Sequence, residues 1–419
     1  MLARRKAVIP LAGVVASAIA LSACSSGTSA GNTSAGTAGA SSSLVKLGIV
    51  TDVGNPGANF ADEVAAARAA VRGVNRRGGI DGHQVQLVFC NEDINPNQAQ
   101  ACVREMISDK VMATVGDEIV SDEEGADKLL SAAGIPSVSP ESYSYDAQDP
   151  NSYLIAPGQE FLNAAQAEAA VKYGGKRVGL LRVDVPTTVP YVPALQKALT
   201  RLGGVYAGQA VTAESTIDFS PYAAGLMHDK ADVVTTDTNE AAATQIFKTM
   251  ASLGFSGKEV VAADALQLST VKSLGSLASR LIFVSPFPPA SAAAEYPGMK
   301  QFNEDMAAEL AAGDKSAANY QVFDRGIALE AYFGVIAIQK IADQAKVSDS
   351  AGLKKTLDSA KNVDLGGVIP PWTPNKSISK VIPRASNDAM YISVWSGGKL
   401  KLLTDKPIAV ASLVDATNS

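Results

Sequence analysis

Residues 45–93 read VKLGIVTDVGNPGANFADEVAAARAAVRGVNRRGGIDGHQVQLVFCNED, and this stretch decides the fold. The apolar run at 47–50 is typical of a strand buried on both faces, and a turn rich in Gly and Pro follows it. From residue 60 to residue 74, apolar side chains recur every three or four positions, as along one face of a helix. Polar and apolar side chains alternate over 84–89, which predicts a second strand parallel to the first. One βαβ unit is therefore expected.

The same alternation of strand and helix continues along the chain to about residue 284. Further strands are expected at 112–116, 135–139, 177–183, 205–211, 233–236, 260–262 and 281–284, and helices at 122–133, 161–173, 192–202 and 240–253. Such regular alternation predicts an α/β fold with mainly parallel sheets, covered by helices on both faces. Any ligand crevice is then expected at the carboxyl ends of the strands.

The last third of the chain does not predict a third compact domain. Helices are expected at 297–312, 319–342 and 351–360, followed by a hairpin over 390–403 around a Gly-Gly turn. These pieces would complete two Rossmann-like lobes that are joined by a hinge of three connections. Lobe 1 is expected to comprise 45–157 plus 287–362, lobe 2 to comprise 158–286 plus 363–405, and residues 406–419 to form a C-terminal tail.

The N-terminus indicates the compartment. Three basic residues at 4–6 precede an apolar run at 7–20, and Leu-Ser-Ala-Cys ending at Cys24 resembles the lipobox of a bacterial lipoprotein. Residues 1–23 would be the signal peptide and Cys24 the lipid-bearing residue, so the protein would be extracytoplasmic and held on the outer face of the cytoplasmic membrane by its lipid anchor only. An ordinary secretory leader or a short membrane anchor is the alternative. The Ser-, Gly- and Thr-rich residues 24–44 predict a flexible tether.

Composition and motifs argue against several classes of function. The chain has 419 residues, 47% of them hydrophobic, which is enough for two ordinary cores, and its formal charge of −6 gives no basic face for nucleic acid. The two histidines, His83 and His228, have no nucleophile in a recognisable setting, and the VGNPGANF turn does not make GxGxxG. We therefore expect no enzyme activity, no cofactor and no metal.

Cys90 and Cys102 are the cysteines that follow Cys24. Cys90 ends an expected strand, and Cys102 lies on the helix announced by Asn95-Pro96, so the two can meet. Outside the cell the pair would be oxidised, which predicts a disulfide worth roughly 3 kcal/mol in the chain-entropy model. A catalytic or metal-binding pair is the weaker alternative, because no histidine or third cysteine lies nearby.

Several short motifs follow one another in order: GIV at 48–50, NRRGGIDG at 75–82, Cys90 and Cys102, VG at 115–116 with Ser121, and GIP at 134–136 leading to Ser139 and Pro140. In this order, behind a lipobox, they resemble the Leu/Ile/Val-binding family of type I substrate-binding proteins of ABC transporters. The resemblance extends from residue 45 to residue 403. It implies a monomeric receptor that closes two lobes around a small polar molecule and delivers it to an ABC permease of the branched-chain amino acid type. A sensor of the same fold that signals to a membrane partner is the alternative.

The resemblance also implies ligand-binding positions. In the first lobe they fall on Phe60, on Ser121 or its neighbour Val120, and on Glu141, Ser142 and Tyr143; in the second lobe they fall on Thr187 or Thr188, Asp237 and Asp264. Asp264 stands where amino-acid binders use an acid to hold the ammonium group.

The charges of these positions favour one class of ligand. Glu141, Asp237 and Asp264 occur in the expected clamp without an arginine or lysine, so a free carboxylate on the ligand would be poorly compensated. An amine, an amide or another amino acid-like or hydroxylated molecule fits better than a branched-chain amino acid. The alternative for each acid is a solvated loop residue or a helix cap, and the alternative for Phe60 and Tyr143 is packing in the core.

Overall fold

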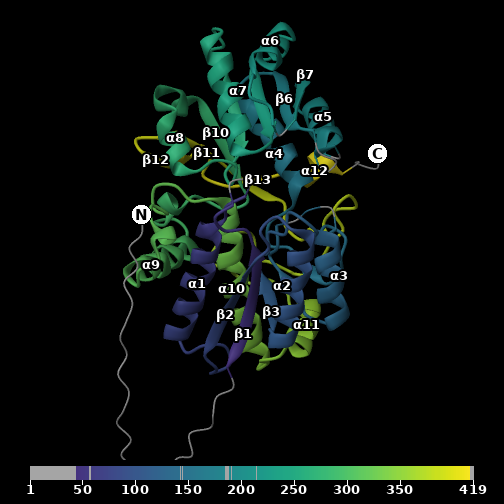
Figure 1. Ribbon diagram of the computed structural model, residues 1–419, viewed down its shortest axis with the longest axis vertical. Helices are drawn as coiled ribbons and strands as arrows, with labels where there is room; N and C mark the ends of the chain where they lie inside the picture. The colour runs from purple at the N-terminus through teal and green to yellow at the C-terminus, as the bar shows by residue number, and fades with distance from the viewer. Residues whose placement is uncertain are drawn as a thin grey trace, which may run out of the picture. The chain divides into compact units, whose positions relative to one another are not determined.

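Two β-sheets organise the part of the chain that the computed structural model describes, residues 44–415 apart from 56–57, 142, 144, 185–187, 190 and 214 (Figure 1). Residues 42–419 form one compact unit. The expected leader, Cys24, Ser142 and Thr187 lie outside the described residues.

The first sheet is wholly parallel, with the strand order β2-β1-β3-β4-β5. Its strands are β1 (Val45–Thr51), β2 (Val85–Asn91), β3 (Ala113–Val115), β4 (Ser137–Val138) and β5 (Ser152–Tyr153). The expected βαβ unit is confirmed: α1 (Ala61–Arg76) joins β1 to β2, and Val45 pairs with Val85 in parallel register. The two-residue strand β5 was not expected, because its length gives no alternation to recognise.

Helices cover both faces of this sheet. Helices α2 (Pro96–Asp109) and α3 (Glu123–Ala133) pack on one face, around Cys102, Met106 and Leu130. Local sequence fixes where they begin: the side chain of Asn95 accepts a hydrogen bond from the Asn97 amide at the start of α2, and Asp122 caps α3 in the same way. The predicted disulfide between Cys90 and Cys102 is confirmed, with 5.5 Å between the Cα atoms, and it ties β2 to α2.

Helices from the last third of the chain complete the other face of the first sheet. They are α9 (Pro297–Ala311), α10 (Gly326–Ala345) and α11 (Ser350–Ser359), and α10 packs against α1 (Figure 1). Helix α10 begins seven residues later than expected, because Asn319 adopts a left-handed conformation with φ of 66° that a helix does not accommodate. Gly116 lets α10 approach: a Cβ there would lie 2.5 Å from Ala331.

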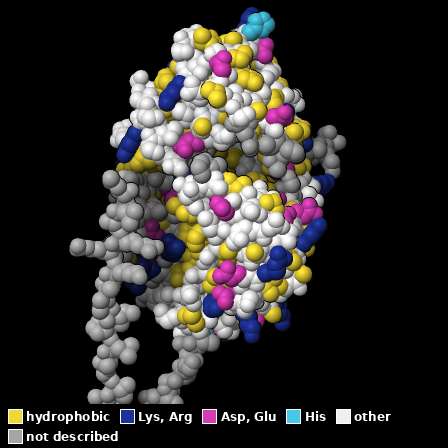
Figure 2. Space-filling model, in the orientation of Figure 1, with side chains coloured by type: hydrophobic (Ala, Val, Ile, Leu, Met, Phe, Trp, Pro, Cys, Tyr) yellow, Lys and Arg dark blue, Asp and Glu magenta, His cyan; other side chains and the backbone are white. Residues whose placement is uncertain are grey.

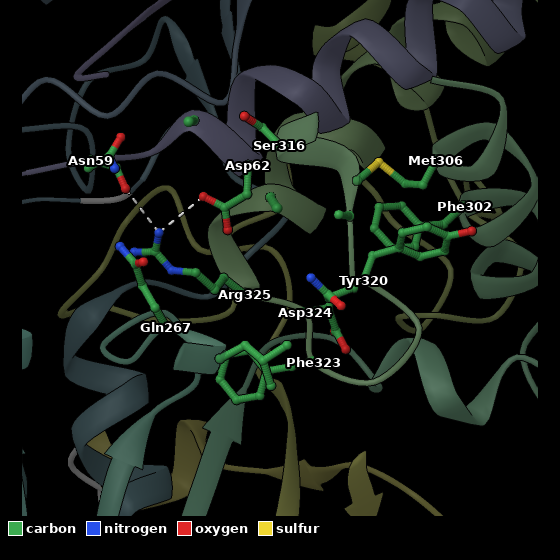
Figure 3. Close-up of a pocket in the computed structure, with 15 residues that line it drawn as sticks. Asn59, Asp62, Gln267, Phe302, Met306, Ser316, Tyr320, Phe323, Asp324 and Arg325 are labelled. Atoms are coloured by element: carbon green, nitrogen blue, oxygen red, sulfur yellow. Dashed lines mark hydrogen bonds and ion pairs between the residues drawn. The ribbon is translucent and has the colours of Figure 1, made fainter. Parts of the chain in front are cut away.

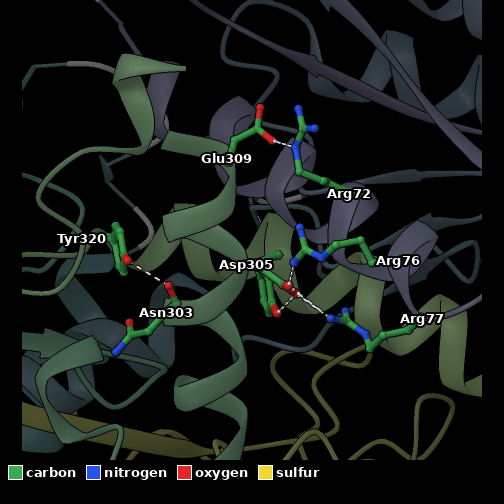
Figure 4. Close-up of polar contacts among 8 residues, drawn as sticks. Arg72, Arg76, Arg77, Asn303, Asp305, Glu309 and Tyr320 are labelled. Carbon is green, nitrogen blue, oxygen red and sulfur yellow. Dashed lines mark hydrogen bonds and ion pairs between the residues drawn. The ribbon is translucent and has the colours of Figure 1, made fainter. Parts of the chain in front are cut away.

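Ion pairs join α1 to α9 (Figure 4). The buried carboxylate of Asp305 lies 2.6 Å from Arg76 and 3.0 Å from Arg77, and it also accepts a hydrogen bond of 2.8 Å from Tyr332. Glu309 lies 2.6 Å from Arg72. Gly73 makes this approach possible, since a Cβ there would come within 2.1 Å of the Asp305 carboxylate.

The second sheet has the order β12-β11-β10-β9-β8-β6-β7, with β13 paired to β11. Its strands are β6 (Arg177–Val183), β7 (Val205–Thr212), β8 (Val233–Asp237), β9 (Lys258–Ala262), β10 (Leu281–Ser285), β11 (Ala389–Ser396), β12 (Lys399–Leu402) and β13 (Ile408–Ala409). Strands β6 to β10 are parallel, and the antiparallel hairpin β11-β12 was expected. The helices around it are α4 (Gln159–Tyr173), α5 (Tyr191–Arg201), α6 (Ser220–His228), α7 (Glu240–Ser252), α8 (Leu268–Ser273) and α12 (Ala411–Val414). The α/β fold with two mainly parallel sheets is confirmed.

The C-terminal part departs from the expected boundaries. Leu365, Val368 and Trp372 still belong to the core of the first lobe, so the chain leaves that lobe after residue 372 rather than near 363–367. The segment expected as a tail carries β13 and α12, and Val410 and Val414 are buried in the core of the second lobe. These contacts join residues far apart in the sequence, and no local pattern announces them.

The surface agrees with the composition. On the face drawn in Figure 2, basic and acidic side chains are interspersed, without one basic surface. None of the helices in the described part of the chain is both long enough and apolar enough to span a membrane.

Candidate functional site

Acidic side chains gather where strands of the two sheets end. In the first lobe, Glu118 follows β3 and Glu141 follows β4; in the second, Asp237 ends β8 and Asp264 follows β9. Glu141 and Asp264 line one crevice together with Glu330 of α10, so acids from the two lobes meet there. The carboxyl ends of parallel strands are the usual position for a ligand in α/β folds.

The crevice is small as it stands. Its volume is about 30 Å³, and the remaining wall includes Gln159, Leu162 and Met390. Space of this size holds one or two water molecules. A solute of amino-acid size does not fit in this space as it stands.

Few hydrogen-bond donors face the acids of the crevice. The hydroxyl of Tyr143 donates to Glu118, and the amide of Gln159 donates to Glu141 at 2.7 Å. Glu118 and Glu330 are both 3% exposed, and each has one carboxylate oxygen without a hydrogen-bond partner among the described residues. The buried Ser139 hydroxyl is also unpartnered, and Ser139 has a left-handed backbone with φ of 58°, which a residue with a side chain rarely adopts.

Burial and mutual repulsion favour the protonated form of these carboxyl groups. Burial, together with the charge of Asp264, raises the pKa of Glu141 to about 8. Burial and the charge of Glu141 raise the pKa values of Glu118 and Glu330 well above the ordinary range. Burial also raises the pKa of Asp264, although Arg325 opposes the shift. A positive charge placed among these carboxyl groups would oppose the shifts.

The second lobe contributes a further carboxylate. Asp237 accepts a hydrogen bond of 2.8 Å from Asn163, and its other oxygen is buried without a partner among the described residues. Burial raises its pKa to about 6, while Asn163 and Arg182 lower it. The nearby hydroxyl of Tyr191, at the start of α5, is likewise buried and unpartnered.

One arginine enters the site from far along the chain. Arg325, just before α10, donates to the Asp264 carbonyl at 2.9 Å and to Asp62 at 3.1 Å, so it links the two lobes. Its guanidinium also lies 5.4 Å from the ring centre of Phe60. The expectation that no arginine or lysine lies among these acids is wrong. Arg325 acts on Asp264, and Arg182 acts on Asp237. The acids still outnumber the cations.

A larger cavity lies on the other side of Arg325 (Figure 3). It has a volume of about 210 Å³, and Asn59, Asp62 and Gln267 line it together with apolar side chains that include Phe302 and Phe323. In Figure 3 the guanidinium of Arg325 points toward Asn59 and Asp62, and the two interactions there are made with the Asn59 carbonyl and the Asp62 carboxylate. Arg325 therefore lines this cavity and is hydrogen-bonded to Asp264, which lines the acidic crevice.

The structure places the sequence-predicted residues in different settings. Glu141, Tyr143 and Asp264 come together in or beside the crevice, and Asp237 approaches from the second lobe. The Ser121 hydroxyl donates to Glu92 at the end of β2. The Thr188 hydroxyl donates to the Val183 carbonyl at 2.8 Å, which closes a turn.

Sequence reasoning missed Glu118, Glu330 and Arg325. Glu118 follows a predicted strand by a few residues, so its position was a signal that could have found it. Glu330 of α10 and Arg325, just before α10, follow Glu141 by more than 180 residues, and only the tertiary fold brings them near it.

Comparison with known proteins identifies the family. Residues 44–399 match the family model described as "Periplasmic binding protein". The chain belongs to the periplasmic binding protein family. This membership confirms the resemblance seen in the sequence, and it also confirms the prediction that the chain is not an enzyme, because the family is one of solute binders.

Individual relatives of this periplasmic binding protein are distant. A Leu/Ile/Val-binding protein of Escherichia coli (strain K12) is 25% identical over 142 residues, which cover 34% of this chain and 38% of that relative. The solved structure of a leucine-binding protein from Thermotoga maritima has a TM-score of 0.69 at 16% identity and covers 86% of this chain and 98% of that one. A fatty acid ABC transporter substrate-binding protein from Thermomonospora curvata has a TM-score of 0.70 at 16% identity. The match covers 88% of this chain and 93% of that one. Likeness at this identity shows the fold alone.

Proposed function

We propose that this periplasmic binding protein captures a small cationic or amide-bearing solute in the acidic crevice and presents it to an ABC permease. The observation that carries the proposal is a set of buried acceptor oxygens, on Glu118, Glu330 and Asp237, for which the described residues provide no donor. A buried acceptor without a donor costs roughly 1–3 kcal/mol, and more when it is charged. Ammonium and amide N–H groups on a ligand would supply the missing donors.

Charge supports the same class of ligand. Four carboxyl groups, those of Glu118, Glu141, Asp264 and Glu330, influence one another in the crevice, and Arg325 is the cation that acts on Glu118 and Asp264. Arg325 is already engaged by Asp62 and by two carbonyl groups. A ligand carboxylate would therefore meet repulsion, whereas an ammonium group would be attracted.

Capture requires movement of the lobes. The crevice of about 30 Å³ is too small for a solute of amino-acid size, so we propose that the lobes open and close about the three connections between them. Closure around a ligand then stabilises the form in which donors and acceptors are matched.

The place of action is part of the proposal. The leader and Cys24 support an extracytoplasmic protein on a lipid anchor, and partnership with a permease rests on the family and on the names of relatives. The comparisons do not favour the alternative of a signalling sensor. Permease and ATPase genes beside this one would support transport, and a neighbouring sensor kinase gene would support the alternative.

A thermal-shift screen of the full chain at pH 8 tests the ligand class. We expect amines, amides and amino acids with a second amine to raise Tm, by about 2.7 kcal/mol of stabilisation at a hundredfold excess over Kd, and dicarboxylates to have no effect. Asp264→Asn should weaken binding of the best ligand at least about tenfold, which is about 1.4 kcal/mol, through loss of one ionic contact. Glu304→Gln, on the exposed face of α9, is the matched control. Stabilisation by dicarboxylates alone would contradict the proposal.

A further inference from the structure

A second group of acids lies in the first lobe, at the start of α3. Glu123, Asp127 and Asp146, here called the acidic cluster, each offer a carboxylate oxygen, and these oxygens all lie within 4.8 Å of one another. Asp127 is 4% exposed and Asp146 is 3% exposed. Glu123 and Asp127 are four residues apart on α3, which places them on one helix face, and Asp146 comes from the turn between β4 and β5.

One oxygen of the Asp127 carboxylate, Oδ2, is buried without a hydrogen-bond partner in the described part of the chain. By contrast, Glu123 accepts from the Tyr145 and Asp146 amides at 3.2 and 3.0 Å, and Asp146 accepts from the Ser152 hydroxyl. A buried carboxylate with neither donor nor cation is among the most costly groups that a protein can hold. The unpartnered oxygen of Asp127 is therefore an observation independent of the grouping of acids.

The charges around Asp127 increase the free-energy cost of burying its carboxylate. The neighbours that act most strongly on it are all acids: Glu123, Asp117, Asp149 and Asp122. Burial and these charges raise the pKa of Asp127 well above its usual range, and burial with the charges of Asp127 and Glu123 does the same to Asp146. Lys128, the next residue on α3, pairs with Glu124 at 2.5 Å and is 59% exposed. Arg384 donates to the Ser152 carbonyl and to Asn375, so it is engaged outside the cluster.

We propose that the acidic cluster binds a divalent cation of the size of Ca²⁺. Ca²⁺ takes oxygen ligands at about 2.3–2.6 Å, so two ligands on opposite sides of the ion lie about 4.6–5.2 Å apart, which suits oxygens within 4.8 Å of one another. Three carboxylates offset the charge of the ion, and the unpartnered oxygen of Asp127 becomes a ligand. Mg²⁺ requires stricter octahedral geometry at about 2.0–2.1 Å and fits less well.

The ion would act on the segment that carries part of the crevice. Asp146 lies three residues after Tyr143 and five after Glu141, and the Glu123 carboxylate already holds the amides of Tyr145 and Asp146. A cation that joins α3 to this turn would fix the segment on which Glu141 and Tyr143 stand. This site does not depend on the ligand class proposed above, and its test uses the metal alone.

The experiment measures thermal unfolding of the chelator-treated full chain at pH 7.5 during a CaCl₂ titration from about 10 μM to 10 mM, the range of extracellular Ca²⁺ sites. Saturation should raise Tm by about 2–4 °C at a hundredfold excess over Kd. Tb³⁺ added to the same protein should show luminescence excited through Tyr145, and Ca²⁺ should displace it.

Variants separate an ion site from a protonated cluster. Asp127→Asn should abolish the Ca²⁺-dependent shift while its Tm in chelator equals or exceeds that of the wild type, because the amide needs no counter-charge. Asp146→Asn should also lose the shift, and Glu124→Gln, an exposed acid on the same helix, should keep it. If the wild type shows no saturable Ca²⁺ shift, or if Asp127→Asn keeps the full shift, the proposal is overturned and the carboxyl groups share protons instead.

Discussion

The α1–α9 contact and the crevice both bury acids of the first lobe, and they differ in how the charge of these acids is compensated. In the α1–α9 contact, Asp305 and Glu309 are 1% and 4% exposed. Both form ion pairs with arginines of α1 or of the residue that follows it, which are Arg72, Arg76 and Arg77. In the crevice, Glu118 and Glu330 are 3% exposed, and each has an oxygen without a partner among the described residues. Both regions carry acids of similar burial. The first region is therefore expected to serve stability, whereas the second is the one for which we propose a ligand.

The largest expected effect is on the unfolding free energy, at the ion pairs between α1 and α9. Asp305→Ala removes the partner of two arginines and leaves the buried Tyr332 hydroxyl without an acceptor. We expect a loss of about 2–4 kcal/mol of unfolding free energy, reduced from the value for a fully buried pair because both arginines are partly exposed. Urea unfolding measures it, with Glu304→Gln as the control. A loss below about 0.5 kcal/mol would show that these ion pairs do not stabilise the lobe.

The next effect is the pH dependence of the ligand-free protein. Burial raises the folded-state pKa values of Glu141 to about 8, of Asp324 to about 7 and of Asp237 to about 6, so the folded chain holds protons that the unfolded chain has released. The stability that these groups contribute is therefore fully present below their unfolded-state pKa values, 3.8 for the two aspartates and 4.5 for Glu141, and it is lost as pH rises toward 8. Thermal unfolding between pH 5 and pH 9 should show Tm falling. Glu141→Gln should reduce the fall of Tm at the high-pH end of this range. A Tm that rises throughout the range would contradict the raised pKa values.

A smaller change in unfolding free energy is expected for the acids of the crevice. Glu330→Gln replaces a buried carboxyl group by a neutral side chain of the same size, so the ligand-free unfolding free energy at pH 8 should stay the same or rise by about 1 kcal/mol. The same variant should bind the identified solute at least about tenfold more weakly. Urea unfolding and calorimetric titration give the two values. Destabilisation comparable to that of Asp305→Ala would remove the distinction between the two regions.

The smallest effect tests an assignment made by resemblance. Because the Ser121 hydroxyl donates to Glu92, Ser121→Ala should change ligand affinity less than about threefold, which is below 0.7 kcal/mol. Burial raises the pKa of Glu92 to about 7, and the Ser121 hydrogen bond lowers it, so the variant should raise it further. Titration by NMR of the Glu92 side chain checks the shift. A tenfold loss of ligand affinity would indicate that Ser121 contacts the ligand.

The sequence predicted those parts of the molecule that local patterns determine. Periodicity located the strand and helix of the first βαβ unit, and the resemblance to a known family pointed to Glu141 and Asp264. The start of α10 was misplaced because the left-handed Asn319 and the turn around it leave no periodic signal. Arg325 and Glu330 were missed for a related reason, since their roles arise from contacts made across some 60 to 270 residues of sequence.

The same limit applies to the charge balance of the crevice. Counting charges in the predicted loops gave acids alone, and the structure adds Arg325 and Arg182. The conclusion about the ligand still holds as a proposal, because Arg325 is occupied by Asp62 and by main-chain carbonyls.

The most direct test of the central claim is the identity of the small molecule that copurifies with the full chain. Denaturing extraction followed by mass spectrometry would identify it, and readdition to stripped protein would confirm saturable binding. The acidic crevice predicts an amine, an amide or an amino acid-like cation, bound more tightly at pH 8 than at pH 6 because binding displaces protons from Glu141 and its neighbours. A carboxylate without an amine, such as a fatty acid, bound more tightly at pH 6, would contradict the account.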